Sequence, residues 1–247
     1  MEYLKKIITD IEILSVEGIK ECFENGINPN DNYRDKPLIY ELITEYCRGA
    51  KFKECVKTFV DYGLNFDDKI LLAVLMDDAA LLDDQLSEDT EAIDNRYSFE
   101  CAFITLYKAS LLHICAEYNH LACAKILINR GIDVNVKAGI DENGFGGQTP
   151  IFHTVNQNEN RCIDVMKYLI SQSADLTFTV NGLIWGKGYE WETFIPAVNP
   201  ISYAVMGLLP QFHRKENQIY EVIIFLLKAA YDIEYTPSNI PNKYLNK

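Results

Sequence analysis

The chain has little basic charge and no long apolar run. Its 247 residues contain 23 Lys and Arg against 36 Asp and Glu, a formal net charge of −13. No run rich in Lys or Arg offsets this charge, so the attraction to phosphate that nucleic-acid binding needs is missing, and anionic membrane surfaces are equally poor partners. No segment approaches the roughly 20 apolar residues of a membrane-spanning helix, and residues 1–10 lack the apolar core of a signal peptide. We therefore expect a soluble protein that is not secreted and binds neither nucleic acid nor membrane.

The sequence also lacks the short motifs of common catalytic classes. It contains no G-x-x-x-x-G-K-[ST], no G-x-S-x-G and no H-E-x-x-H. Two glycine-rich stretches, 144–147 and 186–188, lack the preceding strand and following helix that a phosphate-binding loop requires. Many carboxylates are present, but no pocket that would pair them as acid and base follows from the sequence. We therefore expect no enzymatic activity and no cofactor.

Cysteine usage indicates reduced thiols. The seven cysteines are odd in number and lie mostly inside apolar helical patterns, as small buried side chains do. A reducing cytoplasm is the simplest location. His113, Cys115, His120 and Cys123 are close in sequence, but tetrahedral zinc needs four ligands that converge on one point, usually with short paired spacings, so we expect no metal site.

One short pattern recurs five times: two adjacent apolar residues, a small residue three positions later, and Asn or Asp two positions beyond it. The small residues are Gly26, Gly63, Gly131, Ser173 and Ala230. This pattern is typical of a helix end, where the apolar pair buries the last turn, glycine takes the left-handed conformation and Asn or Asp begins the next turn. Ser173 and Ala230 fit the left-handed position less well. The pattern predicts five helix ends.

A second, shorter helix is predicted before several of these ends. Ser110 is a suitable N-cap for the first of them, and counterparts begin at Pro37, Pro150 and Pro200, where the missing N–H is harmless in the first helical position. Between Gly63 and Gly131, the apolar residues of 70–86 predict a further pair of short helices, although this pair lacks the glycine that ends the others. Helix pairs therefore recur along the chain.

Residues 110–135, SLLHICAEYNHLACAKILINRGIDVN, resemble an ankyrin repeat at nearly every defining position. They match its helix-opening T-P-L-H-x-A-A, its G-H and its L-L-x-x-G-A-D-x-N positions. His113 and His120 match structural histidine positions of the family, and Cys115 and Cys123 match small core positions, so both thiols should be almost inaccessible. The resemblance covers most of the chain. It implies an all-α fold, an ankyrin-repeat solenoid of about six helix-pair repeats with β-hairpin-like finger loops and irregular insertions. The approximate repeats, in one domain at 1–236 with a tail at 237–247, are 1–30, 31–67, 68–107, 108–146, 147–195 and 196–236.

Three segments depart from the family pattern by insertion. We expect residues 138–147 to form an extended finger. The β-prone residues 97–107 are expected to form a hairpin with their neighbour. Residues 179–194 are expected to form a hairpin with its tip at Gly186-Lys187-Gly188. Irregular loops on a repetitive scaffold are places where specificity is added. The rings of Trp185, Tyr189 and Trp191 either contact a partner or pack as a small satellite core, and both roles can hold for different rings.

Acidic side chains concentrate in the third repeat. Residues 67–94 contain ten Asp or Glu against one Lys. Such a patch either steers a basic partner or is simply a solvated face. The candidate steering residues are Asp77, Asp78, Asp83 and Asp84.

The resemblance implies a concave binding face formed by the first helices and the fingers. Threading the repeat places seven residues there, and Phe145, Trp185, Tyr189 and Trp191 lie on the fingers. We expect a non-catalytic, monomeric, cytoplasmic adaptor that binds a protein partner. Two alternatives remain: a dedicated inhibitor or immunity protein that masks a basic toxin or enzyme, and a host-directed bacterial effector. The seven residues are Tyr40, Thr44, Glu117, Tyr118, His153, Asn156 and Tyr203.

Overall fold

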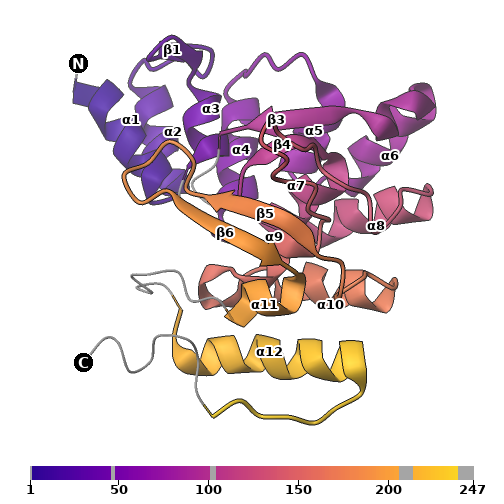
Figure 1. Cartoon of the computed structure of the whole chain (residues 1–247). Coiled ribbons are helices and arrows are strands. Elements are labelled where there is room, and N and C mark those ends of the chain that lie inside the picture. The colour runs from indigo at the N-terminus through magenta and orange to yellow at the C-terminus, as the bar shows by residue number, and fades with distance from the viewer. Residues whose placement is uncertain (1, 46–47, 101–103, 206–213, 239–247) are drawn as a thin grey trace.

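A computed structural model of the chain describes residues 2–45, 48–100, 104–205 and 214–238. These residues form twelve α-helices that follow one another in pairs along a curved stack (Figure 1). The helices are α1 Glu2–Glu12, α2 Val16–Glu24, α3 Ile39–Thr44, α4 Phe52–Asp61, α5 Lys69–Leu75, α6 Ala79–Glu88, α7 Leu111–Tyr118, α8 Leu121–Asn129, α9 Phe152–Val155, α10 Ile163–Ser171, α11 Pro200–Val205 and α12 Glu216–Tyr231.

The left-handed helix ends follow the recurring pattern closely. Gly26, Gly63 and Gly131 have φ of 97°, 92° and 97°, and Ser173 takes the same region at 69° in spite of its Cβ. The prediction for Ala230 is wrong, because α12 continues to Tyr231 and Asp232 is the left-handed residue, with φ of 54° and its N–H bonded to the Lys228 carbonyl. Aspartate tolerates this region through its short polar side chain, whereas alanine resists it.

Only some of the predicted helix starts agree with the structure. Pro200 begins α11 as predicted, but Pro37 lies in a strand and Pro150 lies in the tight turn before α9. The hidden helix pair is present as α5 and α6, whose N-caps Asp68 and Asp78 accept the N–H groups of Leu71 and Leu81. Their apolar residues join the core although no glycine ends the pair.

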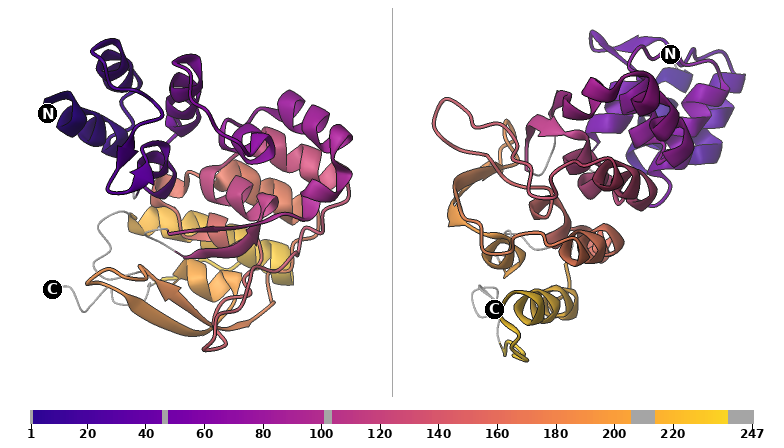
Figure 2. Two further views of the ribbon diagram at one scale, coloured as in Figure 1. Left: turned by 90° about the horizontal axis from the view of Figure 1, so that it is seen from above. Right: turned by 90° about the vertical axis from the view of Figure 1, so that its right-hand side faces the viewer.

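Three small antiparallel sheets correct the expectation of an all-α chain. β1 Asn32–Tyr33 pairs with β2 Lys36–Pro37, β3 Arg96–Phe99 with β4 Leu106–Ser110, and β5 Val180–Trp185 with β6 Thr193–Val198. The third sheet is the hairpin predicted for 179–194. The β-prone segment 97–107 is part of the second sheet, in which β3 and β4 pair with each other rather than with a neighbouring finger. The 138–147 loop is a finger closed by a bridge between Ile140 and Gly146. In Figure 2 this loop and the β5–β6 hairpin project on the same side of the helices.

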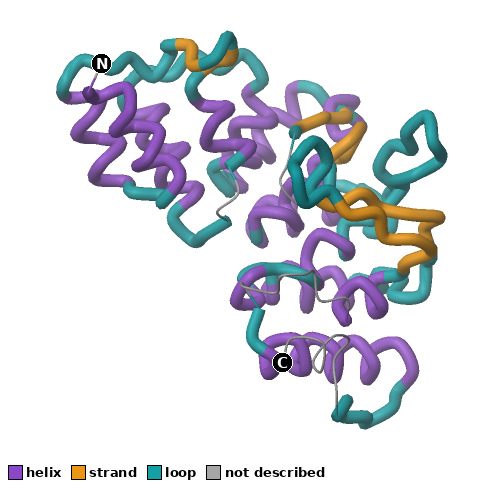
Figure 3. The backbone as a smooth tube through the Cα atoms, turned by 60° about the vertical axis from the view of Figure 1, so that its left-hand side comes forward, coloured by secondary structure: helices purple, strands orange, loops and turns teal. Residues whose placement is uncertain are grey.

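The stack changes between the second and third helix pairs. α1 packs on α3 and α2 on α4, and farther along α5 packs on α7, α6 on α8, α7 on α9 and α9 on α11. Within the described residues, no comparable packing joins α3 to α5 or α4 to α6. The first four helices therefore form one group at the N-terminal end of the arc (Figure 3). One continuous core, including the fully buried Phe52, still connects the two groups.

Gly131 offers a clean test of the repeat assignment. A Cβ added there meets no atom within 4 Å, so any penalty comes from the left-handed backbone alone. We expect Gly131→Val to lower the free energy of unfolding by about 1–2 kcal/mol. Gly131→Asn, which tolerates this conformation, should lose clearly less. Urea denaturation of the three proteins checks this, and equal losses for both variants would show that backbone conformation is not the cause.

Candidate functional site

The three insertions, far apart in sequence, meet on the finger side of the stack. The Gly139 N–H bonds to the Tyr107 carbonyl at 2.8 Å, and the Gly146 N–H bonds to the Gly182 carbonyl at 3.0 Å. Ile104 forms an isolated bridge with Trp185. The rings of Phe145 and Phe194 lie 4.7 Å apart between centroids. The insertions therefore build one surface, which we call the insertion cluster (97–100, 104–107, 138–147 and 179–198).

The aromatic hairpin divides between packing and exposure. Trp185 is 9% exposed, and its ring lies 4.5 Å from that of Trp191. Tyr189 stacks on Trp191 with 4.5 Å between ring centroids but is 48% exposed. Gly186 is required for this arrangement, since a Cβ there would lie 1.9 Å from the Trp191 ring. Trp185 and Trp191 thus support the hairpin, while Tyr189 is available for contact.

Further apolar side chains of the insertion cluster face solvent. Tyr107, Ile140 and Phe194 are exposed although each is large and apolar. A polar chain normally scatters such residues singly, whereas a gathered set is typical of an interaction site. These three were missed as site residues in the sequence. In the strand-prone segments, alternate side chains point to opposite faces, which indicated that either Tyr107 and Phe194 or their neighbours are exposed. Which face of a hairpin is exposed depends on how the hairpin packs, and the sequence does not show this.

A groove runs along this side through three adjoining hollows. The first, of about 740 Å³, lies between β3 and the loops around Pro29, Pro37 and Leu64. The second, of about 660 Å³, shares Ser98 and Phe99 with the first and extends to Tyr189. The third, of about 270 Å³, shares Tyr107 with the second and reaches Phe145 and Ile184. We call the three hollows together the finger groove.

Some of the residues predicted to lie on the concave face line the finger groove, and others are buried. Tyr40 lines the first hollow, and the Thr44 hydroxyl donates to the Tyr40 carbonyl at 2.7 Å. Phe145 lines the third hollow. Asn156 is half-buried and its amide donates to the carbonyl of Tyr203, whose own side chain is buried. Of the seven threaded residues, Tyr40 is thus the one that the structure places at the finger groove.

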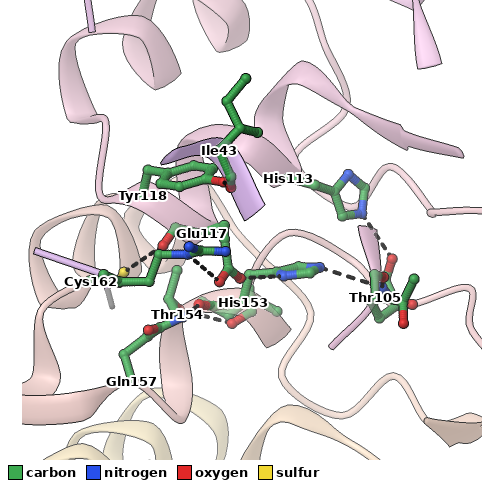
Figure 4. A network of polar contacts seen from close by, with 12 residues as sticks. Ile43, Thr105, His113, Glu117, Tyr118, His153, Thr154, Gln157 and Cys162 are labelled. Atoms are coloured by element: carbon green, nitrogen blue, oxygen red, sulfur yellow. Dashed lines mark hydrogen bonds and ion pairs between the residues drawn. The ribbon is translucent and has the colours of Figure 1, made fainter. Parts of the chain in front are cut away.

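Glu117, Tyr118 and His153 belong to a buried polar network (Figure 4). Glu117 and Tyr118 also line a hollow of about 570 Å³ that lies outside the finger groove. The Glu117 carboxylate lies 3.3 Å from Nε of Arg48 and accepts from Nδ1 of His153 at 2.9 Å, and all three side chains are at most 5% exposed. The Tyr118 hydroxyl donates to the Ile43 carbonyl, and Arg48 covers the Tyr118 ring at 4.7 Å. These side chains join α7 to the α3–α4 loop and to α9, and their contact with a partner stays a prediction.

Burial and neighbouring charge set the protonation of this network. Burial opposes ionisation of Glu117, but the hydrogen bond from His153 and the charge of Arg48 outweigh it and hold the pKa of its carboxyl below the ordinary value. Burial, with the adjacent His153, lowers the pKa of His113 to about 3. His113 is therefore neutral, with Nδ1 2.8 Å from the Ser110 hydroxyl and Nε2 2.9 Å from the Gln148 carbonyl.

Three of the four candidate aspartates have a hydrogen-bond or ion-pair partner within the chain. Asp77 accepts from the Cys123 N–H and from Lys53, and Asp78 caps α6. Asp83 pairs with Arg130 at 2.6 Å. Asp84 is exposed and has no partner among the described residues. Asp78 and Asp84 are exposed and the Asp83 side chain is 50% exposed, whereas the Asp77 side chain is 8% exposed, so a steering role for these aspartates stays a prediction.

The thiols are structural where the structure describes them. Cys115 and Cys123 are both 0% exposed, which confirms the predicted inaccessibility, and burial raises the pKa of the Cys115 thiol well above its ordinary value. The His120 imidazole lies 2.7 Å from the Val74 carbonyl. No group of three or more His, Cys, Asp or Glu in the described part of the chain is arranged to hold a metal ion. Cys47 and Cys101 lie outside the described residues.

No helix in the described ranges is both long and apolar enough to cross a membrane. The stacked helix pairs agree with a comparison of the sequence with family models, in which residues 17–180 match the model described as ankyrin repeats in three copies. No curated protein matches the chain. The matched range covers about two thirds of the 247 residues and contains α2 to α10 with two of the three insertions, and α11–α12 adds a further helix pair beyond it. The chain belongs to the ankyrin-repeat family.

Proposed function

We propose that this protein is a non-catalytic interaction module or adaptor that binds a protein partner through the finger groove. Ankyrin repeats generally mediate protein–protein interaction, and this family membership supports the class of function. On this proposal the six helix pairs each count as one repeat of a single domain at 1–236, and the protein acts as a monomer in the cytoplasm. The function of the repeats is then to hold the binding surface rigid.

The convergence of the three insertions carries the choice of surface. The repeats by themselves need no such additions, yet the described residues of the three insertions (104–107, 138–147 and 179–198) bond to one another and present exposed Tyr107, Tyr189 and Phe194. Aromatic side chains are enriched at the energetically important centres of interfaces because they bury a large area with few rotatable bonds. A cluster built from insertions and ending in exposed rings is best explained by a partner that covers it.

The charge of the groove favours a basic partner. Asp67, Asp68, Glu100, Asp141 and Glu142 line its hollows, against Arg96 and Lys187. Complementary charge raises the rate of association and excludes wrong partners. The same preference suits an inhibitor or immunity protein that masks a basic toxin or enzyme. Among the residues that the structure describes, no contact or charge distribution favours that alternative, or a host-directed effector, over a general adaptor.

Tyr189 provides the test of this proposal. We expect Tyr189→Ala to weaken binding of the partner by about 2 kcal/mol or more, mainly through faster dissociation, because truncation of a central aromatic anchor has this effect. The partner is first captured from the native organism on the intact chain and then measured by surface plasmon resonance. Tyr235→Ala, which removes a ring of similar exposure near the C-terminal end, is the matched control and should leave affinity unchanged. Equal affinities for wild type and Tyr189→Ala would contradict the assignment of the site.

A further inference from the structure

β3 has one paired edge and one open edge. It belongs to a two-stranded sheet in which β4 is its neighbour. Among the described residues, no backbone group of Arg96 to Phe99 bonds to any segment other than β4. An unpaired strand edge presents a row of N–H and C=O groups that another extended chain can join.

The first hollow of the finger groove lies along this open edge. It is lined by all four consecutive residues of β3 and by none of β4. Successive side chains of a strand point to opposite faces, so a hollow that touches every residue in turn lies beside the edge rather than over one face. The space is about 740 Å³ and coincides with the change in stacking between α3–α4 and α5–α6.

The opposite wall of this hollow is a poor partner for a strand. It is formed by Pro29, Asn30, Pro37 and the loop after α4. Proline has no N–H, so Pro37 on β2 cannot donate to an added strand. The β3 edge, in contrast, carries the irregularity at Ser98. The register with β4 shifts between Tyr97 and Phe99, so Ser98 has no paired residue on β4, and its hydroxyl takes the Lys108 N–H at 3.0 Å. Ser98 is therefore the irregular position of β3, and among the described residues no segment other than β4 bonds to its backbone.

The side chains around the hollow indicate the chemistry of an occupant. Tyr40, Leu64, Phe66 and Tyr97 supply apolar and aromatic surface. Asp67 is exposed and forms no ion pair among the described residues, and Asp68 already accepts from the Tyr97 hydroxyl at 3.0 Å. Arg96 is directed away, since its guanidinium donates to the Lys137 carbonyl. An apolar side chain against the rings and a Lys or Arg beside Asp67 would complement this wall.

We infer that an extended segment of the protein partner, carrying an apolar and a basic side chain, adds a strand to β3 in the first hollow of the finger groove. This inference rests on the proposed function and names the part of the partner that enters the site. Main-chain hydrogen bonds to β3 supply affinity, and the Tyr40, Tyr97 and Asp67 side chains supply selectivity, as in other cases of strand addition.

The test uses a phage-displayed library of random dodecapeptides selected on the intact chain, followed by synthetic versions of the selected peptides. Affinity is measured for wild type, Ser98→Pro and the matched control Ser98→Ala. Both variants lose the hydroxyl, but proline alone removes the backbone N–H and crowds the edge. We expect about a tenfold loss for Ser98→Pro, the effect of about one lost hydrogen bond, and little change for Ser98→Ala. Asp67→Asn should weaken peptides with Lys or Arg and spare those without.

Amide hydrogen exchange of the wild-type chain provides a second measurement that does not depend on a variant's folding. The selected peptides should slow exchange in Arg96 to Phe99. Suppose that a selected peptide binds Ser98→Pro as tightly as wild type, loses affinity with Tyr189→Ala and leaves exchange in β3 unchanged. That combination would overturn strand addition and leave the proposed function intact. Failure to select any peptide would also overturn it, while capture of a folded partner would still support the proposed function.

Two other occupants would likewise contradict the inference. Concentration-dependent protection of β3 without peptide, together with a dimer in sedimentation, would assign the edge to a second copy of the chain. Faster exchange in β3 after removal of residues 239–247 would assign it to the chain's own C-terminal end.

Discussion

Replacement of Glu117 by alanine should lower the free energy of unfolding by about 3–5 kcal/mol, because it leaves the Arg48 guanidinium charged and buried without the carboxylate that balances its charge. Arg48 is 5% exposed and Glu117 is 1% exposed, so both charges are largely removed from water and depend on each other for compensation. His153 loses its acceptor in the same step. Urea denaturation at neutral pH measures this loss.

An exposed pair gives the matched control. Arg161 and Glu159 lie 2.9 Å apart, but Glu159 is 62% exposed, and Glu159→Ala should cost no more than about 1 kcal/mol. Glu117→Gln keeps the shape of the side chain and removes its charge, so most of the loss should remain. A Glu117→Gln protein as stable as wild type would show that the charge of this residue is not what stabilises the network.

The same variant gives a pH dependence with a defined sign. The pKa of Glu117 is lower in the folded chain than in the unfolded one, so the unfolded state binds the proton more readily. The stabilisation is complete above the ordinary glutamate pKa of about 4.3 and is lost as pH falls through the lower folded value. The difference in stability between wild type and Glu117→Gln should therefore be largest at neutral pH and shrink in acid.

Phe52→Ala should have an effect of similar size and also change the cooperativity of unfolding. Phe52 is 1% exposed and stacks on Tyr118 with 4.3 Å between ring centroids, so it connects α4 to α7 where direct packing of α4 on α6 is weak. Truncation of a buried phenylalanine costs about 3–5 kcal/mol. Because the lost contact joins the two groups of helices, we expect the single unfolding transition to separate into two.

Phe59→Ala is the control for this separation. Phe59 is fully buried on the same helix, but its ring packs on Phe23 at 4.9 Å, within the N-terminal group. Its loss should destabilise that group without weakening the connection to α7. Calorimetry that gives the same single transition for both variants would contradict the special position of Phe52.

Local chemistry explains why parts of the fold were predictable. The left-handed conformations of Gly26, Gly63 and Gly131 follow from residues within one turn, and the two insertion hairpins follow from β-prone runs on either side of short loops. The prediction of a left-handed residue at Ala230 was wrong because Asp232, two residues later, takes the left-handed conformation instead. The recurring pattern contains both residues and does not choose between them.

The candidate site was less predictable because it depends on contacts between distant residues. Threading a repeat assigns Glu117 and His153 to a face, but it does not contain the α3–α4 loop, from which Arg48 covers that face. Asp77, Asp83 and their neighbours appear as one acidic patch until Lys53 and Arg130 are placed beside them. Likewise, each insertion was visible separately, whereas their assembly through Gly139, Gly146 and Ile104 was not.

Hydrogen–deuterium exchange of the intact chain, alone and with the captured partner, tests the assignment of the finger groove most directly. Amide exchange slows where a partner covers or orders the backbone. The account predicts protection concentrated in β3, β4, the 138–147 loop and the β5–β6 hairpin, with little change in α6, α8 and α10. Protection confined to those three helices, with unchanged exchange along the finger groove, would contradict it.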